Sequence, residues 1–272
     1  MRRFYCILAI AILAFTACSK EPGRGEKDTY TTVHFSVNGF QAFVGEGVKS
    51  VGDASAVSQL LVGVFDTSGN ALEGYKQVVS STAGGFDFSL DLVKGMTYDV
   101  VLFAQSTDRF VNTASWTAAS LKSINMPATR TLSVEDDDAF AAVEHVVAGD
   151  SKEVAVFLSR AWAQVNVGTT VSLSSITGAT LTITGLPITF NALSGEVSGS
   201  QTITWTGAPS GTFTVESTVY NNIGYAYAPA GETQILVDAT IQLNTSTGPA
   251  RSKEVKNIPL KKNHRTNIIG TI

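Results

Sequence analysis

The residues of this sequence that could carry out catalysis or bind a metal are few and lie far apart. The three histidines are His34, His145 and His264, and none has a second histidine or a cysteine at the spacing of metal ligands. The sequence holds no Gly-x-Ser-x-Gly elbow, no His-Glu-x-x-His motif and no phosphate-binding loop. We therefore expect a protein that is not an enzyme and that uses no cofactor and no metal.

Asp136, Asp137 and Asp138 form an acidic run that could suggest calcium binding. A calcium loop, however, alternates its acids with other residues and adds a glycine and a distal glutamate, which this run does not. Phe140, Val143 and Val147 recur at helical spacing, and carboxylates are favoured at the start of a helix. The pattern predicts one short helix within residues 133–147, with solvated acids at its start.

The tryptophans offer another chemistry, the stacking of sugar rings. Trp162 lies within an alternating stretch, which favours the core, whereas Trp116 lies in a polar, loop-like stretch. Sugar stacking and core packing can be distinguished by the solvent exposure of four rings, Trp116, Trp205, Tyr225 and Tyr227. Exposed, coplanar rings would favour sugar binding, and buried rings would be core packing.

One cysteine is placed for a covalent modification. Two arginines near the start precede an apolar run of about 14 residues, which is the layout of a secretory signal and too short to span a bilayer. The residues Phe15-Thr16-Ala17-Cys18 resemble the bacterial lipobox, whose cysteine is acylated; the alternative is an ordinary signal peptide cleaved near Ala17. We expect residues 1–17 to be a lipoprotein signal peptide, and Cys18 to anchor the chain through lipid in the outer membrane. Cys6 lies in the removed segment, so no disulfide is expected.

Composition restricts the class of the remaining chain. Residues 18–29 are charged and contain glycine and proline, as expected for a flexible spacer. Charged residues make up 15% of the sequence and the net charge is −4, which leaves no basic surface for nucleic acid. The abundance of serine, threonine, glycine and valine favours an all-β protein.

Alternating apolar residues predict the strands. The stretch "FDFSLDL" (86–92) places Phe86, Phe88, Leu90 and Leu92 on one face, and with "YDVVLFAQ" (98–105) it predicts a hairpin. Further strands are predicted at residues 30–37, 59–65, 152–167 (one long strand or two joined strands), 179–191, 202–205, 211–218, 222–229 and 233–243, and two more within 255–272. A drop in charge near Gly168 suggests two domains, an N-terminal β-sandwich over residues 30–168 and a C-terminal one over 169–272.

Five blocks of sequence, taken in order, resemble the fimbrillin-like lipoproteins of Bacteroidota, which are related to type V pilins. The blocks are "FSLDLVKGMTYDVVLFAQ" (88–105), "DDDAFAAVE" (136–144), "KEVAVFLSRAWAQVNVGT" (152–169), "LTITGLPITFNALSGEVSG" (181–199) and "VKNIPLKKNHRTNIIGTI" (255–272). The resemblance implies two transthyretin-like β-sandwich domains in a surface lipoprotein. It also implies that a protease trims the amino-terminal part, and that a strand from a neighbouring subunit fills the groove left behind.

The resemblance suggests which residues would take part in that exchange. The candidate exchangeable strand spans residues 31–37, with Val33, Phe35 and Val37 facing one way, and Arg24 is the possible processing site. No arginine lies between Arg24 and Arg109, so cleavage at Arg24 would release the lipid and leave this strand in place.

The closing segment is the second candidate. Arg265, Thr266, Asn267 and Ile268 begin a last strand of ordinary length, which we expect to complete its own sandwich and not a neighbour's.

These observations favour a lipid-anchored structural protein of the cell surface. We expect it to act as a pilus anchor, accessory protein or subunit through β-strand pairing. Its partners would then be the outer membrane, through lipid, and other pilus subunits. The alternative is a surface lipoprotein that binds glycans or host ligands.

Overall fold

The computed structural model describes residues 29–40, 53–82, 85–126, 129–132, 135–149, 152–169, 176–208, 212–215, 218–231 and 233–270. Seven strands form the sheet nearest the amino terminus. They are β1 (Tyr30–Phe40), β2 (Gln59–Asp66), β3 (Gln77–Ser80), β4 (Phe86–Val93), β5 (Thr97–Gln105), β8 (Phe140–Val147) and β9 (Lys152–Arg160). Their order in the sheet is β3-β2-β5-β8-β9-β1-β4.

The remaining strands form three further sheets. Their bounds are β6 (Ile124–Asn125), β7 (Thr129–Thr131), β10 (Trp162–Thr169), β11 (Ile176–Leu186), β12 (Thr189–Phe190), β13 (Val197–Ser198), β14 (Gln201–Gly207), β15 (Thr212–Val215), β16 (Thr218–Tyr227), β17 (Gln234–Thr245), β18 (Arg251–Lys261) and β19 (Arg265–Gly270). The orders are β15-β16-β10-β19, β18-β17-β11-β14-β7 and β13-β12-β6.

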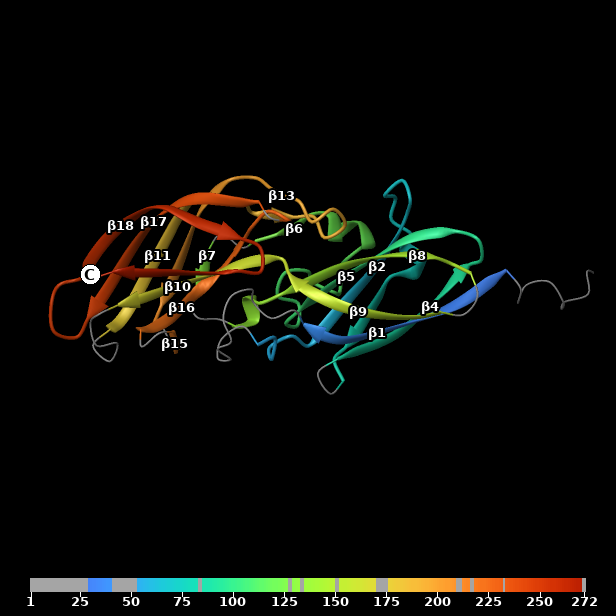
Figure 1. Ribbon diagram of the computed structural model, residues 1–272, viewed down its shortest axis with the longest axis horizontal. Coiled ribbons are helices and arrows are strands. Elements are labelled where there is room, and N and C mark those ends of the chain that lie inside the picture. Colours follow the sequence, from blue (N-terminus) through green and yellow to red (C-terminus); the bar gives the residue numbers. More distant parts are fainter. Residues whose placement is uncertain are drawn as a thin grey trace, which may run out of the picture.

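The all-β prediction is confirmed. The helical elements of the described residues are three short 3₁₀ turns, η1 (Glu73–Tyr75), η2 (Ala118–Lys122) and η3 (Glu135–Asp137). In the same residues, no helix has the length and apolar character needed to cross a membrane. The sheets follow one another along an elongated molecule, with the seven-stranded sheet towards one end and β17, β18 and β19 towards the other (Figure 1).

Two apolar clusters form the core. The larger one contains residues from both halves of the chain, which are the residues before and after Gly168. Leu60 of β2 packs in the cluster around β1 and β4, whereas Leu61 packs in a cluster that also holds Ile258 of β18. Because both faces of β2 and β5 are buried, these strands appear in the sequence as continuous apolar runs. The predicted boundary near Gly168 stays a prediction, but the apolar core itself extends from one half into the other.

The helix predicted within residues 133–147 is wrong. From Glu135 the chain makes one 3₁₀ turn and then forms β8, which pairs with β5 over eight positions. Val143 and Val147, which suggested helical spacing, are exposed at 39% and 57%. Pairing in the sheet therefore outweighs a weak local preference for helix.

The hairpin predicted over residues 86–105 is also wrong, although both of its strands exist. β4 pairs with β1, and β5 pairs with β2 and β8, so the turn at Lys94 and Gly95 joins two strands that are not neighbours. The face predicted for Phe86, Phe88, Leu90 and Leu92 is correct, because all four side chains are buried.

The long alternating stretch at 152–167 forms two joined strands, β9 and β10, that run through both halves. β1 lies parallel to β9, and β19 lies parallel to β10. Ala161 separates β9 from β10 and is buried. The first and the last described strands are therefore both held by one central ribbon (Figure 1).

Candidate functional site

The candidate exchangeable strand, β1, lies inside the seven-stranded sheet. It pairs with β4 in antiparallel and with β9 in parallel orientation. Val33, Phe35 and Val37 point into the core, each at most 1% exposed, and the Phe35 ring stacks on Phe88 with the centroids 4.7 Å apart. Burial of such a side chain contributes roughly 1.5–3 kcal/mol, so removal of β1 would open this core along the length of the strand.

The candidate C-terminal strand, β19, lies at the edge of its sheet. Among the described residues, its backbone pairs with β10 alone. Arg265 Nε donates a hydrogen bond to Gln164 Oε1 at 2.8 Å, and Asn166 Nδ2 donates to Asn267 Oδ1 at 3.0 Å. These side-chain bonds fix the register of β19 on β10.

A second set of contacts joins β19 to β18. Thr266 Oγ1 donates to the carbonyl oxygen of Pro259 at 2.5 Å. Ile268 packs in the larger apolar cluster, whereas the next residue, Ile269, is 61% exposed. In this single chain β19 pairs with β10 and packs against its own core. That it completes its own sandwich and not a neighbour's stays a prediction.

The polar residues before β19 form the turn that brings it alongside β10. Asn263 has a positive φ of 58° and is buried, and its backbone N–H donates to the Trp162 carbonyl at 2.8 Å. Lys262 lies with Nζ 6.0 Å from the centroid of the Phe190 ring, and partial burial lowers its pKa. The turn is thus attached to β10 and to the aromatic core.

The lipid and processing predictions fall on other parts of the chain. Cys18 and Arg24 lie outside the described residues, so the lipobox and the possible cleavage site stay predictions.

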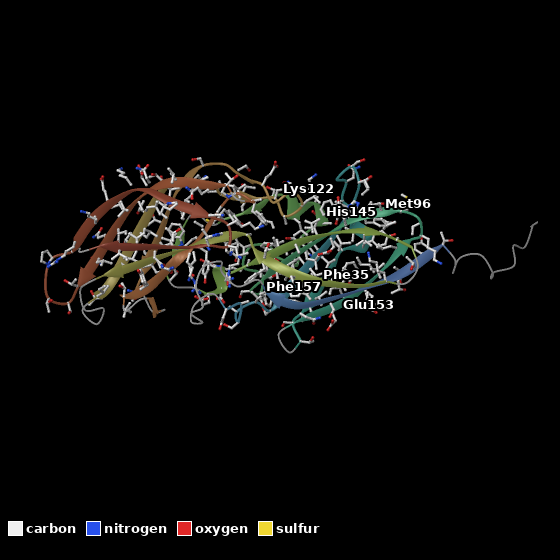
Figure 2. All side chains as sticks on the ribbon, in the orientation of Figure 1. Phe35, Met96, Lys122, His145, Glu153 and Phe157 are labelled. Carbon is white, nitrogen blue, oxygen red and sulfur yellow. The ribbon has the colours of Figure 1, made fainter. Side chains whose placement is uncertain are left out.

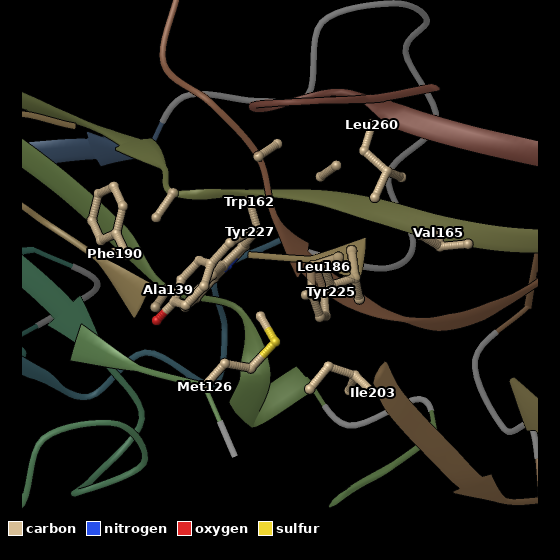
Figure 3. Close-up of a cluster of buried hydrophobic side chains, with 14 of the residues drawn as sticks. Met126, Ala139, Trp162, Val165, Leu186, Phe190, Ile203, Tyr225, Tyr227 and Leu260 are labelled. Carbon is tan, nitrogen blue, oxygen red and sulfur yellow. The ribbon is translucent and has the colours of Figure 1, made fainter. Parts of the chain in front are cut away.

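The aromatic rings considered for sugar stacking are core residues. Trp116 is 6% exposed, and Trp205, Tyr225 and Tyr227 are at most 1% exposed. Trp162 stacks on Tyr227 with centroids 4.8 Å apart, and both lie within the cluster drawn in Figure 3. Burial raises the pKa of Tyr227, whose hydroxyl donates to a backbone carbonyl. None of these rings is a platform for a ligand.

Two residues of the acidic run, Asp137 and Asp138, are buried and paired, which the sequence analysis missed, whereas Asp136 is exposed. Asp137 accepts hydrogen bonds from Arg109 Nε at 2.6 Å and from Arg130 Nε at 2.9 Å. Asp138 accepts from both Arg160 Nε and Arg160 Nη2 at 3.0 Å. These carboxylates are therefore occupied by arginines, and the described residues contain no group of acids, histidines or cysteines placed to hold a metal.

This ion-pair cluster joins the two halves of the chain. Arg130 Nη1 donates to the backbone oxygen of Tyr225 at 2.9 Å, and the Tyr225 hydroxyl donates to Glu135 at 3.0 Å. Burial raises the pKa of Asp138 to about 6, against the opposing effect of Arg160. Burial likewise lowers the pKa of Arg130. We read the cluster as a structural connection, because its charged groups satisfy one another.

A shallow hollow of about 370 Å³ lies on the outer face of β1, β4 and β9. His34 Nδ1 and Ser89 Oγ are hydrogen bonded at 2.7 Å, and Ser36 Oγ donates to Asp87 Oδ1 at 2.7 Å. Glu153 stands opposite His34 in the parallel pairing of β1 with β9. Cross-strand bonds thus hold His34, Ser36, Asp87 and Ser89 in place around the hollow.

A second depression, of about 440 Å³, lies where η2 meets the segment around β12 and β13. Lys122, Asn191 and Glu196 contribute polar groups to it. Lys122 Nζ is already bonded to the carbonyl of Gly69 at 3.1 Å, and Asn191 Oδ1 accepts from the backbone N–H of Leu193 at 3.0 Å. These bonds stabilise the loops around the depression.

Comparison with known proteins adds a family and a fold. The model of DUF6562, described as a family of unknown function, matches residues 28–272. Comparison of the sequence with curated proteins gives no match.

Several solved structures share the fold. A candidate cell adhesion protein from Bacteroides ovatus has a TM-score of 0.52 at 12% identity, with 89% of this chain and 92% of that chain covered. A candidate adhesin from Bacteroides thetaiotaomicron has a TM-score of 0.52 at 15% identity, covering 85% and 80%. A candidate polysaccharide-binding protein from the same species has a TM-score of 0.51 at 14% identity, covering 82% and 78%. At these identities the likeness is one of fold.

Proposed function

We propose that this chain, which belongs to the DUF6562 family, is a lipid-anchored, fimbrillin-like structural protein of the bacterial cell surface. It pairs β-strands with other pilus subunits, as an anchor, an accessory protein or a subunit, and it is not an enzyme. Support comes from the fold that it shares with candidate adhesins of Bacteroides and from the lipobox-like residues that end at Cys18.

The position of β1 carries this proposal. β1 is the first described strand, it lies between two partners, and its inward side chains contribute to the core. A strand that leaves such a place uncovers hydrogen-bonding groups on both neighbours and three apolar sites. An incoming strand with the same alternation satisfies all of them.

A disulfide that holds β1 in place tests strand exchange. Ser36 and Ala155 are paired positions on β1 and β9, and neighbouring strands bring paired Cα atoms within disulfide range. The double variant Ser36→Cys/Ala155→Cys, once oxidised, should remain monomeric under conditions in which the wild type forms filaments. Reduction should restore assembly.

The matched control joins two strands that are not proposed to move. Thr182→Cys/Thr204→Cys links β11 to β14 at a paired position and should assemble whether oxidised or reduced. Equal assembly of the oxidised β1–β9 variant would show that β1 stays seated, and the exchange would then be wrong.

The lipid anchor has its own test. Replacing Cys18 by alanine should release the protein from membranes or leave its signal peptide uncleaved, because no acyl chain can be attached. Cell fractionation with mass spectrometry of the mature amino terminus measures both outcomes. A Cys18→Ala protein that is processed and membrane-bound like the wild type would contradict lipid anchoring.

The hollow on β1, β4 and β9 favours a second role, the binding of a ligand at the cell surface. One protein of the same fold is described as a candidate polysaccharide-binding protein. The two roles use different side chains of β1, because the hollow lies on the outer face of the sheet and the core side chains of β1 lie on the inner face.

A further inference from the structure

We propose that the outer face of β4, β1 and β9 is a binding site for a neutral saccharide chain, with Phe157 as its aromatic platform. This inference rests on the proposed surface location and does not require strand exchange. It is carried by an exposed ring, a hollow beside it and a set of unoccupied hydrogen-bond acceptors, which we take in turn.

Phe157 is an aromatic ring that faces solvent beside the β1 backbone. It lies in the middle of β9, alternates with the buried Val156 and Leu158, and is 72% exposed (Figure 2). On β1 the paired position is Gly39, where a Cβ atom would come within 3.0 Å of the ring. Because glycine leaves this space open, the ring edge rests on the β1 backbone while much of the ring stays open to a ligand. A ring held in this way loses little conformational freedom on binding.

The hollow lies along the strands from this ring. Glu153 and Ala155 precede Phe157 on the same face of β9, at steps of about 7 Å for every two residues (Figure 2). His34 and Ser36 occupy the neighbouring positions on β1, and they pair with Glu153 and Ala155. A chain of sugar rings laid along β9 would therefore meet the phenyl face first and the polar hollow next.

The polar groups of the hollow are mainly acceptors, and several of them are unoccupied. Asp87 Oδ1 accepts from Ser36; Asp91, which lies beyond the hollow on the same face of β4, accepts from Thr32 at 2.7 Å. Within the described part of the chain, the second oxygens of both aspartates and the whole carboxylate of Glu153 have no hydrogen-bond partner. Hydroxyl groups of a sugar are donors that match them, whereas an acidic sugar would be repelled by three carboxylates.

A saccharide fits this face better than a protein does. Interfaces between proteins have a core of several apolar side chains with few charges. Besides Tyr30 at the start of β1, Phe157 is the one large apolar side chain that the described residues of β1, β4 and β9 expose. One stacking ring beside hydrogen-bonding side chains suits a ligand that has both apolar ring faces and hydroxyl groups.

The site is assembled from three strands, and β1 supplies its centre. If β1 left the sheet, His34 and Ser36 would leave with it, and Gly39 would no longer support the ring. The saccharide therefore cannot bind to a molecule from whose sheet β1 has left.

Isothermal titration calorimetry on the purified chain from residue 19 tests the proposal. The probes are four neutral hexasaccharides (cellohexaose, xylohexaose, mannohexaose and maltohexaose) and one acidic probe, hexagalacturonic acid. We expect at least one neutral probe to bind and the acidic probe not to bind. Phe157→Ala should weaken binding about tenfold or more, a loss typical of an aromatic anchor. Asp87→Asn/Glu153→Gln should also weaken it.

The matched control is Ile269→Ala, which removes another exposed apolar side chain, 61% against 72% for Phe157, from β19 and should leave binding unchanged. The site would be wrong if no neutral probe bound, if the acidic probe bound better, or if Phe157→Ala bound as the wild type does. Loss of self-association in Phe157→Ala, without saccharide binding by the wild type, would identify a protein interface instead. Protease treatment of intact cells tests the surface location separately. The proposed location and the proposed saccharide site can therefore be contradicted independently of each other.

Discussion

Asp138 is a fully buried carboxylate whose partner, Arg160, is equally buried. Its pKa, raised to about 6, lies above the ordinary 3.8, so the folded chain binds this proton more tightly than the unfolded chain does. The contribution of this group to stability is therefore largest below about pH 4 and decreases as the pH rises to about 6. The decrease amounts to about 3 kcal/mol.

Urea unfolding between pH 4 and pH 7 measures this effect. The difference in stability between the wild type and Asp138→Asn should change across that window and become constant above it. Surface aspartates with lowered pKa values, such as Asp66 and Asp108, serve as a control, because they lose their stabilising effect only at lower pH. A constant difference from pH 4 to pH 7 would contradict the raised pKa of Asp138.

Two phenylalanines of the amino-terminal sheet give a matched pair for stability. Phe88 is 8% exposed and stacks on Phe35, whereas Phe157 is 72% exposed. Phe88→Ala should lower the free energy of unfolding by roughly 3–5 kcal/mol, because it leaves a cavity. Phe157→Ala should change it by less than about 0.5 kcal/mol. Equal losses in chemical denaturation would mean that the two faces of the sheet are assigned incorrectly.

The sequence was sufficient to predict the burial of core residues such as Phe88. It was not sufficient to predict the ion pairs of Asp137 and Asp138. Alternation alone places Phe88 in the core, because period two is a local property of a strand. The partners of Asp137 and Asp138 are separated from them by up to 28 residues, and they meet only when the loops fold against both halves. The spacing of these residues in the sequence therefore does not predict the ion pairs.

At the level of elements, β19 is the most informative strand to remove. Deleting residues 266–272 would expose the edge of β10 and remove Ile268 from the apolar cluster. It would also remove the bonds that Asn267 and Thr266 make to neighbouring strands. We expect the truncated monomer to unfold or to melt at a clearly lower temperature in a circular-dichroism scan.

A different result would change the role of this strand. If the truncated monomer melts like the full chain but no longer forms higher-order species, β19 pairs with a neighbouring subunit. Replacing the exposed Ile269 by serine is the matching mild change, and it should leave the melting temperature nearly unchanged.

Most strands were predictable, and the choice of strand partners was not. The stretches around β2, β4, β5, β11 and β17 show their strands clearly, but β4 and β5 do not pair. A short turn can join two paired strands in a hairpin, or it can join two strands that are not neighbours in the sheet. Which of the two forms depends on how the side chains pack in the core. Similarly, the outward positions of His34 and Asp87 follow from alternation, whereas the parallel neighbour Glu153 comes from a strand more than a hundred residues away.

At the level of the whole molecule, the two halves should unfold together. The larger apolar cluster includes Phe103 of β5 and Leu260 of β18, and the short strand β7 pairs with β14 of the other half. Differential scanning calorimetry of the chain from residue 19 should therefore show one transition. A fragment ending at residue 168 should expose the outer apolar face of β5 and bind a hydrophobic dye.

Two separate transitions would contradict this shared core. So would a fragment that melts cooperatively and binds no dye, because the amino-terminal half would then be an independent domain.

The parallel placement of β1 and β19 along one ribbon also decides how the molecule carries mechanical load. β1 begins at one end of the elongated body and β19 ends at the other, and both run in the direction of β9 and β10 (Figure 1). A pull between these two ends acts along the strands, so the hydrogen bonds between β1 and β9 are strained in shear and must break together. A load between the proposed lipid tether and the far end of the molecule would thus act on these bonds in shear. The same bonds would open one after another if β1 were peeled away from the side.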